Sequence, residues 1–444
     1  MKAGIFRSGT IVLVLVAAMV LGACQATPSA PTETAPGQAS YGSLVFLSTQ
    51  FRPVDEAEKM RTSILKDFPG TVEYLPEDDG PFHDRVSAEV KTGSGTVDLL
   101  GALHGNFAAM VPHNELMDLS DLRSSMTVQI PDTFWELSQL GTQKTYYIPW
   151  TQATYVVVIN KKALDYLPQG VDVNALTYEN LIDWGKAIKD GTGQAKIGFP
   201  AGEKGLLHRF FQGYLIPAYS GGLVTTFGSD EAKEGWKMMQ TLWQYVNPQS
   251  TTYDFMQEPL LSEDVWIAWD HTARLKDALE ARPQDFLAVP SPAGPKGRAF
   301  MPVMSGLAIP VTSPHPDAAK ALIQYLLRDD IQARILQETG FFPVVSLGQE
   351  VQLSEGLKLE SDAVAAQGDA PDALPALLPT GLGDQNAAFN KIFWDAFQAI
   401  VLNQGDVDSV IGQQKEILAG IIQQTGAPCW EPDPDSAGQP CPVN

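Results

Sequence analysis

Three cysteines could do chemistry in this chain, and their positions separate them into two groups. Cys24 stands alone near the N-terminus, directly after a long apolar run, whereas Cys429 and Cys441 lie close together near the C-terminus. A cysteine thiol can carry a covalent modification, pair as a disulfide or bind a metal ion. The residues around each cysteine decide between these possibilities.

The residues before Cys24 are typical of an export signal. Lys2 and Arg7 form a short positive leader, and residues 11–20 are an unbroken apolar run that is too short to span a bilayer as a mature helix. The run ends in the sequence LGAC, which resembles a bacterial lipobox. This resemblance implies that residues 1–23 are a signal peptide and that the Cys24 thiol carries lipid. The alternative is an ordinary signal peptide followed by a chance cysteine.

The segment that begins at Cys24 is expected to be a tether rather than part of the folded body. Residues 25–40 are rich in Pro, Thr, Ser and Ala and contain no large apolar side chain. Such a segment cannot bury a hydrophobic core, so 24–40 is predicted to be a flexible, lipid-anchored tether. We therefore expect the protein at the extracytoplasmic face of a bacterial cell membrane.

Export favours a disulfide between the two remaining cysteines. Cys429 and Cys441 enclose an acidic loop, rich in Pro and Gly, within residues 427–444. A metal site is the competing interpretation, but no histidine lies near these cysteines in the sequence to complete it. The sequence thus predicts a C-terminal loop with a disulfide, no metal site and no cofactor.

Composition limits the class of protein. A body of about 400 residues is larger than one comfortable core, so at least two lobes are expected. The hydrophobic share of 44% and the charged share of 18% are those of a soluble globular protein. The formal net charge of −22 would repel phosphate backbones, which argues against a nucleic-acid partner.

Known catalytic motifs are missing from the sequence. It contains no Gly-x-Ser-x-Gly elbow, no phosphate loop and no His-Glu-x-x-His motif. Acidic residues are plentiful throughout the chain, so pairs of carboxylates say little about glycoside hydrolysis. We expect a protein that is not an enzyme.

Runs of β-forming residues alternate with segments of helical period. Buried strands are expected at 44–47, 97–100, 153–160, 286–289 and 307–309. Helices are expected to begin near Asp55, Thr177, Ser229 and Pro316, and a last helix over 406–424 is ended by Gly426. This alternation predicts an α/β fold with mainly parallel sheets.

The order of several segments resembles the extracellular solute-binding proteins of ATP-binding-cassette importers, in the branch best known for sugars. Each segment matches loosely, and Tyr178 stands where the family usually has Trp, but together they follow the family's order over nearly the whole body. The segments are SAEVKTGSGTVDLLGA (87–102), NELMDLSDL (114–122), YYIPWTQATYVVVINKKAL (146–164), LTYENLIDWGKAIKDG (176–191), EDVWIAWD (263–270), FLAVPSPAGPKG (286–297) and the run 305–344.

The resemblance implies a two-lobed periplasmic-binding-protein fold of type II, in which the chain crosses between discontinuous lobes more than once. Carried onto this sequence, lobe one holds 41–152 and 287–340, and lobe two holds 153–286 and 341–426. It also implies a hinge between the lobes and a ligand cleft that closes as the hinge bends.

A sugar presents an apolar ring face and a rim of hydroxyl groups. Aromatic side chains cover the face, and polar groups must replace water at the rim because a buried unpaired hydroxyl costs about 1–3 kcal/mol. In α/β proteins such side chains lie just past strand ends and in the turns between lobes. Residues of suitable type at these positions are Gln50, Phe51, His104, Asn106, Trp150, Thr151, Tyr219, Trp269, Asp270 and Ser305.

Several of these candidates have a structural alternative. Trp150 could pack in the hinge instead of lining the cleft, and His104 could be a structural histidine. Trp266 and Trp269 point to opposite faces if both lie on one strand, so one of them belongs to the core. Trp269 is the better cleft candidate because Asp270 continues from it into a polar turn.

These features indicate a substrate-binding lipoprotein that captures a sugar or oligosaccharide and delivers it to the permease subunits of an ATP-binding-cassette importer. The alternatives are a binding protein for a polyol, a polyamine or another small solute, and a secreted carbohydrate-active enzyme. A polyamine would use the carboxylate of Asp270 beside Trp269. A phosphate ligand is disfavoured, because the candidate turns contain no Lys or Arg other than Arg52.

Overall fold

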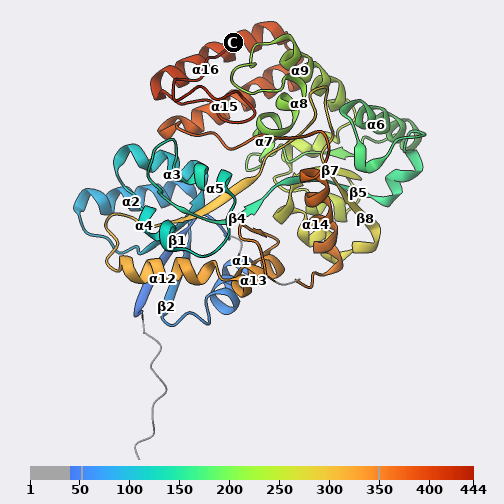
Figure 1. Ribbon diagram of the computed structural model, residues 1–444. Helices are drawn as coiled ribbons and strands as arrows, with labels where there is room; N and C mark the ends of the chain where they lie inside the picture. Colours follow the sequence, from blue (N-terminus) through green and yellow to red (C-terminus); the bar gives the residue numbers. More distant parts are fainter. Residues whose placement is uncertain (1–40, 52–53, 349–350) are drawn as a thin grey trace, which may run out of the picture. The chain divides into compact units, whose positions relative to one another are not determined.

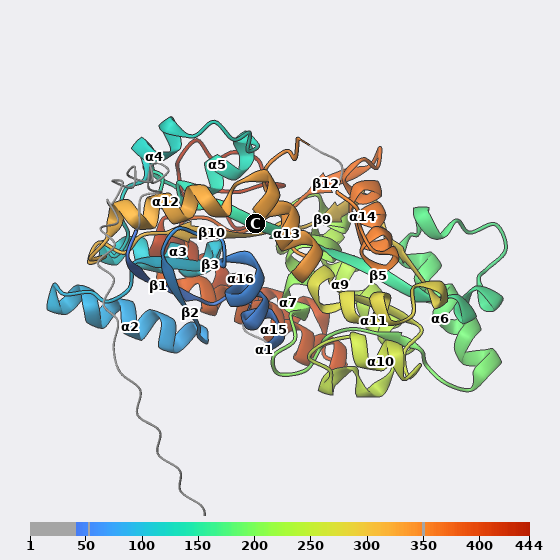
Figure 2. The same ribbon diagram turned by 90° about the horizontal axis from the view of Figure 1, so that it is seen from below.

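A computed structural model of the chain describes residues 41–51, 54–348 and 351–444. Helices flank two separate sheets in this part of the chain (Figure 1 and, seen from below, Figure 2). The predicted signal peptide, Cys24 and the predicted tether lie outside the described residues. Within the described ranges, no helix is long and apolar enough to cross a membrane.

The larger sheet has six strands in the order β11-β4-β10-β3-β1-β2. β1 pairs in parallel with β2 and β3, whereas β10 is antiparallel to β3 and β4, and β11 is antiparallel to β4. We call the part of the chain around this sheet the first lobe. Its strands are β1 (Ser43–Ser48), β2 (Thr71–Pro76), β3 (Leu99–Leu103), β4 (Ile148–Ala153), β10 (Val303–Ala308) and β11 (Phe342–Pro343).

The first strand shows why this sheet forms. Leu44, Phe46 and Leu47 of β1 are fully buried, and consecutive side chains of a strand point to opposite faces, so both faces of β1 are covered. The helices of this lobe are α1 (Val54–Lys59), α2 (Asp79–Thr92), α3 (His104–Met110), α4 (Ser120–Ser125), α5 (Asp132–Ser138), α12 (Pro316–Leu326) and α13 (Asp329–Thr339).

The smaller sheet has four strands in the order β6-β7-β5-β8, and we call the part of the chain around it the second lobe. β5 is antiparallel to β7 and β8, and β6 is parallel to β7. Every residue of β5, YVVVIN, is buried, which explains its continuous run of β-branched residues. The strands are β5 (Tyr155–Asn160), β6 (Ile197–Gly198), β7 (Ile267–His271) and β8 (Phe286–Val289).

Helices make up much of the rest of the described chain. A continuous helical segment joins α7 (Leu207–Phe210), the π-helical turn η5 (Phe211–Leu215) and α8 (Ile216–Ser220). A short parallel pair joins β9 (Arg298–Phe300) and β12 (Ala373–Pro375). The other helices are α6 (Tyr178–Thr192), α9 (Asp230–Trp243), α10 (Gln257–Leu261), α11 (Lys276–Ala281), α14 (Glu355–Gly368), α15 (Asn386–Ala396) and α16 (Val407–Thr425).

The ends of these helices follow capping signals in the sequence. The Thr177 hydroxyl accepts the N–H of Asn180 at 3.2 Å at the start of α6, and the Ser229 hydroxyl accepts the N–H of Ala232 at 3.1 Å at the start of α9. Gly426 ends α16 with a φ of 66°, a left-handed conformation that glycine adopts without strain. The predicted helix starts at Thr177 and Ser229 and the stop at Gly426 are therefore confirmed.

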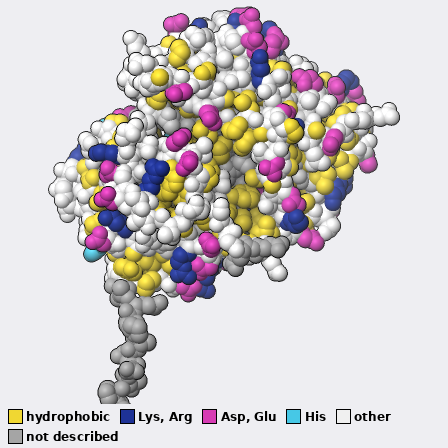
Figure 3. Space-filling view, viewed as in Figure 1, with side chains coloured by type: hydrophobic (Ala, Val, Ile, Leu, Met, Phe, Trp, Pro, Cys, Tyr) yellow, Lys and Arg dark blue, Asp and Glu magenta, His cyan; other side chains and the backbone are white. Residues whose placement is uncertain are grey.

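The negative charge of the chain is spread over its surface on the face that Figure 3 shows. Acidic side chains are scattered across that face, while hydrophobic side chains gather towards its middle. The excess of acidic residues is therefore not concentrated at one place on this face.

Two expectations about the fold need correction. Both sheets are mixed, whereas the sequence predicts mainly parallel ones, because the strands that cross between the lobes run antiparallel to neighbours in each sheet. The predicted return to lobe one at residue 287 falls inside β8, which pairs with β5, so the return lies between Val289 and Val303. The second boundary also shifts: the sequence assigns residues from 341 onward to lobe two, but β11 at 342–343 pairs with β4 in the first sheet.

Candidate functional site

The two lobes are joined by strands that meet at Thr154 and Met301. Thr154 lies between β4 and β5, and its hydroxyl donates to the Met301 carbonyl oxygen at 3.0 Å. The Tyr214 hydroxyl, in η5, donates to Thr154 Oγ1 at 2.9 Å and accepts the N–H of Tyr155 at 3.0 Å. Gly213 allows this close approach, because a Cβ there would collide with the Met301 side chain. The crossing strands are thus tied to the helical segment beside them.

Aromatic side chains form a continuous chain of contacts from the first lobe to the second. Phe51, after β1, packs against Phe341 with ring centroids 4.9 Å apart, and Phe341 lies 5.8 Å from His271 at the end of β7. His271 meets the ring of Tyr155 edge-on at 5.2 Å, and Tyr155 stacks on Trp269 at 4.4 Å. We call these five residues the junction cluster.

Trp269 lies inside the second lobe rather than at its surface. Its side chain is 2% exposed, and Phe210 and Tyr214 meet its ring edge-on at 5.0 and 5.1 Å. Tyr155 covers one face of the ring with only 5° between the two planes. Little of Trp269 is free to stack on a sugar, so this arrangement gives its predicted stacking role no support, and that role stays a prediction.

Four buried polar atoms, two in the junction cluster, one in the residue after His271 and one in α7, have no hydrogen-bond partner among the described residues. They are Tyr155 Oη, His208 Nδ1, Trp269 Nε1 and Thr272 Oγ1. Buried polar groups in proteins are almost always paired, and an unpaired one costs about 1–3 kcal/mol. A ligand with several hydroxyl groups could pair with them.

Two arginines bring positive charge to this region. Arg209 lies in α7 and Arg274 follows β7, and both side chains are partly buried. Burial and then the charges of Arg274 and Arg209 lower the pKa of His271 to about 3, so its imidazole is neutral at physiological pH. The same two charges oppose the rise that burial causes in the pKa of the Tyr155 hydroxyl. Two positive charges thus act on these groups, and the Asp270 carboxylate acts on Tyr155 in the opposite sense.

Phe51 and Trp150, two of the predicted site residues, contact each other in the first lobe. Their ring centroids are 5.2 Å apart, and Trp150 also meets Phe46 at 5.5 Å. Trp150 is fully buried, as the packing alternative requires. Phe51 has a φ of 50°, which is unusual for a large residue.

Gln50, Thr151 and Ser305 make hydrogen bonds within the first lobe. Gln50 Nε2 donates to Thr49 Oγ1 at 3.0 Å, and the Gln50 carbonyl oxygen accepts the Tyr74 hydroxyl. Thr151 Oγ1 and Ser305 Oγ are 2.7 Å apart and link the neighbouring strands β4 and β10. These contacts use much of the hydrogen-bonding capacity that the predicted site would need.

His104 and Asn106 lie in the first turn of α3 and are both bonded within the protein. His104 Nε2 donates to the Pro379 carbonyl oxygen at 2.8 Å, so Nδ1 accepts the Tyr147 hydroxyl at 2.9 Å. Burial lowers the pKa of His104 to about 4. Asn106 Oδ1 accepts the N–H of Leu103 at 3.2 Å. Both side chains therefore have a structural function in this arrangement.

Tyr219 and Asp270 point away from the junction cluster. The Tyr219 hydroxyl donates to Glu179 Oε1 at 3.0 Å and so links α8 to α6. Asp270 follows Trp269 on β7 and therefore faces the opposite side of the sheet. Its carboxylate accepts the N–H of Met256 at 2.9 Å and that of the next residue at 2.7 Å, and burial raises its pKa to about 6.

The structure thus brings only some of the predicted residues together. Phe51 meets Trp150, Thr151 meets Ser305, and Trp269 joins the junction through its neighbour on β5. Sequence reasoning did not select several residues that now stand out at the junction: Tyr155, His208, Arg209, Arg274 and Phe341. The sequence does contain one indication of these residues, namely charged residues next to aromatic ones. This occurs in HRFF at 208–211 and in the polar turn after Trp269.

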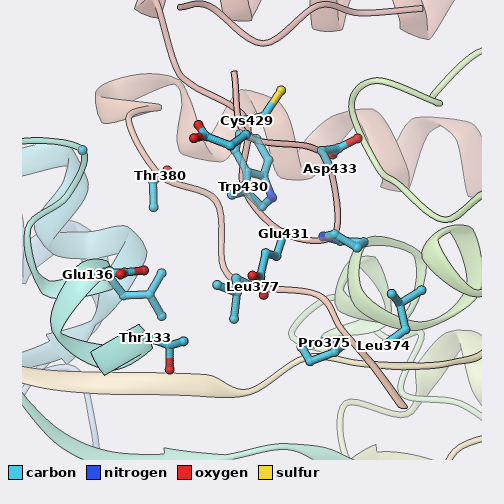
Figure 4. Close-up of a pocket in the computed structure, with 14 residues that line it drawn as sticks. Thr133, Glu136, Leu374, Pro375, Leu377, Thr380, Cys429, Trp430, Glu431 and Asp433 are labelled. Atoms are coloured by element: carbon cyan, nitrogen blue, oxygen red, sulfur yellow. The ribbon is translucent and has the colours of Figure 1, made fainter. Parts of the chain in front are cut away.

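A hollow of about 840 Å³ lies elsewhere, beside the C-terminal tail (Figure 4). Thr133 and Glu136 of α5 line one side of it, and Leu377, Trp430 and Glu431 line the other (Figure 4). None of its lining residues belongs to the junction cluster. This hollow therefore does not contain the polar and aromatic groups described above.

The tail that lines this hollow is firmly attached. Cys429 and Cys441 form a disulfide, as the sequence predicts. The Asp433 carboxylate accepts the backbone N–H groups of residues 223–225 at 3.0, 2.8 and 2.9 Å. The tail is thus held to the loop before α9 by charge-assisted hydrogen bonds.

Solved structures of the same fold cover most of the chain. The GacH receptor of Streptomyces glaucescens, solved unliganded and with acarbose, is 16% identical with a TM-score of 0.69 over 85% of this chain and 98% of that one. Maltose-bound T. maritima MalE3 is 17% identical with a TM-score of 0.70 over 86% and 100%. UgpB from Mycobacterium tuberculosis, solved with glycerophosphocholine, is 18% identical with a TM-score of 0.67 over 86% and 99%. At these identities the similarity shows the fold, which is the predicted two-lobed one.

Comparison with curated proteins gives no match by sequence. Residues 59–357 match the family model described as bacterial extracellular solute-binding protein. The match covers more than half of the chain, and this family implies a small solute as ligand, an ATP-binding-cassette permease as partner and a place outside the cytoplasm. The chain belongs to the bacterial extracellular solute-binding protein family.

Proposed function

We propose that this protein captures a sugar or oligosaccharide at the junction of its two lobes and delivers it to the permease subunits of an importer. The observation that carries the proposal is the junction cluster, where aromatic rings from both lobes meet beside buried polar atoms without partners. Rings and polar groups together complement the apolar face and the hydroxyl rim of a sugar. Acarbose and maltose in two structures of the same fold support this class of ligand.

Capture would use the strands at Thr154 and Met301 as the hinge. Phe341 belongs to the first lobe and His271 to the second, so their ring contact is one that bending at the hinge would break. Separation of these rings would give a ligand access to Tyr155 and its unpaired hydroxyl. Closure around the ligand would then follow as a hinge motion.

Attachment through lipid on Cys24 belongs to the same proposal. A tether over 24–40 would hold the lobes near the membrane subunits while leaving them free to bind solute. The negative charge of the chain, −22, would keep the folded body off an anionic lipid surface.

The polyamine alternative loses its argument in this arrangement. It depends on the Asp270 carboxylate lying beside Trp269, but Asp270 faces the other side of β7 and bonds backbone N–H groups. The positive charges of Arg209 and Arg274 would also repel a polyamine. A polyol shares the hydroxyl chemistry of a sugar and is tested together with it.

The test is a thermal-shift screen of sugars, oligosaccharides and polyols, followed by calorimetry and small-angle scattering. A ligand at about 100 times its dissociation constant should stabilise the folded protein by about 2.7 kcal/mol. Binding with compaction and with the ligand recovered unchanged supports the proposal. Chemical conversion of the ligand, abolished by one carboxylate substitution, would instead indicate the carbohydrate-active enzyme. Absence of binding across the panel would overturn the proposal.

A further inference from the structure

We propose that the solute bound at the junction carries an acidic group, a phosphate or a carboxylate on a sugar or polyol, and that Arg209 and Arg274 hold this group. The inference rests on the proposed function, because it names the class of solute that the same site takes.

Arg209 carries a positive charge without a matching negative one. Its Nη1 donates to Met301 Sδ at 3.6 Å, a weak acceptor, although a guanidinium has five N–H donors to satisfy. Among the described residues no carboxylate oxygen lies within 4.0 Å of it, and Asp79 of α2 acts on it only from farther away. Burial disfavours its charge, since it lowers the pKa of the guanidinium. An anion brought by the ligand would supply the missing partner.

Several other arginines are paired with carboxylates, whereas Arg61 bonds a backbone carbonyl oxygen and Arg123 stacks on Trp135. Arg282, Arg298, Arg328 and Arg334 lie 3.3, 3.6, 2.8 and 2.9 Å from a carboxylate oxygen. Carboxylates are abundant, with 52 acidic against 30 basic residues, so arginine pairing within this protein is easily achieved. An arginine kept at the junction without such a pair is therefore available for a partner from outside.

Arg274 brings the second charge. Its Nη1 donates to the Asp254 carbonyl oxygen at 3.2 Å, and its guanidinium lies over the Phe255 ring with 4.4 Å between the guanidinium carbon and the ring centroid. Asp270 acts on Arg274 electrostatically, but its carboxylate is engaged by two backbone N–H groups and forms no ion pair with Arg274 within 4.0 Å. Stacking on Phe255 fixes the guanidinium plane and leaves its edge for an anion.

The two guanidinium groups act on the same place. Arg209 Nη1 lies 3.6 Å from the sulfur of Met301, whose carbonyl oxygen bonds Thr154 beside Tyr155. Arg274 ends the short turn that starts directly after His271 and contains Thr272. An acidic group between the arginines would leave the hydroxyls of the same ligand for Tyr155 Oη and Thr272 Oγ1. A neutral sugar would instead leave the Arg209 guanidinium enclosed without an ion-pair partner, which is unfavourable in a desolvated site.

The sequence disfavours a phosphate ligand, whereas this proposal includes one. The candidate turns after the strand ends contain Arg52 as their single cation. Arg209 lies inside α7, and Arg274 lies three residues beyond His271. The fold brings both to the junction from outside those turns.

The test uses matched ligands and matched variants in calorimetry on the full mature chain. The ligands are glucose, glucose 6-phosphate and glucuronate, with glycerol and glycerol 3-phosphate as a second set. The variants are Arg209→Gln, Arg209→Lys and Arg274→Gln, and Arg123→Gln is the control. The Arg123 guanidinium carbon lies 4.8 Å from the Trp135 ring centroid in the first lobe. Arg123→Gln therefore removes one positive charge, as the other Gln variants do, without altering the junction.

We expect an acidic member of a set to bind at least tenfold more tightly than its neutral parent. Arg209→Gln and Arg274→Gln should each weaken the acidic ligand tenfold or more, Arg209→Lys should weaken it less, and Arg123→Gln should leave it unchanged. The phosphate and carboxylate arms identify which acid is held. Equal affinity for neutral and acidic ligands would overturn the inference. So would an equal change in affinity for the acidic ligand in Arg209→Gln, Arg274→Gln and the control Arg123→Gln. Neither outcome contradicts the proposed binding of a sugar. Circular dichroism of each variant verifies that it is folded.

Discussion

Tyr155 and Trp269 stack almost parallel, with ring centroids 4.4 Å apart and 5° between their planes. The register explains the contact, because Tyr155 pairs with His271 and Val157 pairs with Trp269, so the two rings are diagonal neighbours on one face of the sheet. Tyr155 also contacts His271, whereas Trp269 is surrounded by rings of the second lobe. Within the junction cluster, Trp269 is therefore packed on the second-lobe side, and Tyr155 is the member that contacts His271.

Replacement of Trp269 by alanine should destabilise the protein. The ring is 2% exposed and packed by Tyr155, Phe210 and Tyr214, so its removal leaves a cavity that costs about 3–5 kcal/mol. Urea unfolding measures this loss. Trp266→Ala is the control, because Trp266 is only partly buried and should cost less. An unchanged unfolding midpoint for Trp269→Ala would show that the ring is not part of the core.

Replacement of Tyr155 by phenylalanine should separate binding from stability. The hydroxyl is buried without a partner among the described residues, so its loss should leave the unfolding free energy unchanged or slightly higher. Ligand affinity should fall about 2- to 13-fold if the hydroxyl bonds the ligand, in line with the roughly 0.5–1.5 kcal/mol of one hydrogen bond. Calorimetry with the best ligand of the screen measures this change. Wild-type affinity in Tyr155→Phe would remove this hydroxyl from the site.

The order of elements was predictable from the sequence, because it depends on local patterns. The buried run of β5 and the caps at Thr177 and Ser229 are read from neighbouring residues. Strand direction was not predictable in this way. It depends on which lobe a strand enters after crossing, and that is a property of the whole chain.

The side chains of the site were harder to predict for a related reason. Trp269 and Asp270 sit at a strand end with suitable chemistry, yet neighbours distant in sequence decide what each one does. Phe210 and Tyr214 bury the ring, and the N–H of Met256 engages the carboxylate. These contacts cannot be predicted from the type and spacing of the residues alone.

His104 should make stability depend on pH. Burial lowers its pKa from 6.5 to about 4, so between these pH values the unfolded chain binds a proton at this residue and the folded chain does not. The contribution of His104 to the free energy of unfolding is therefore fully present above pH 6.5 and decreases as the pH drops towards 4. His208 and His271 act in the same direction, whereas Asp270, whose pKa is raised to about 6, opposes them below that pH.

The measurement is chemical unfolding at several pH values for wild type and His104→Gln. A glutamine amide can still donate to the Pro379 carbonyl oxygen but does not titrate. The variant should lose about 2–3 kcal/mol less than wild type between pH 6.5 and 4.5. His113→Gln, which changes an exposed histidine, is the control. Parallel pH profiles for wild type and His104→Gln would contradict a neutral, buried His104.

Replacement of Cys24 by serine should detach the protein from the membrane or leave its precursor uncut. The reason is that diacylation needs the thiol, and the sequence LGAC ends the predicted signal. Fractionation of cells, with mass spectrometry of the N-terminal peptide, measures the outcome. The double variant Cys429→Ser, Cys441→Ser controls for the loss of cysteine elsewhere in the chain. A processed Cys24→Ser protein that is still retained at the membrane would refute lipid anchoring at this residue.

The C-terminal tail should matter for stability but not for ligand binding. Asp433 is 4% exposed and accepts three backbone N–H groups of residues 223–225, so Asp433→Ala leaves several buried donors unpaired and should cost at least about 2 kcal/mol. The double variant Cys429→Ser, Cys441→Ser should lose up to roughly 3 kcal/mol, because its short loop is no longer closed in the unfolded chain. Both variants should be cut faster by protease in the tail while binding the ligand within about threefold of wild type, since the tail lies outside the junction cluster. A large loss of affinity in either variant, with the rest of the chain still folded, would instead place the hollow beside Trp430 in the binding mechanism.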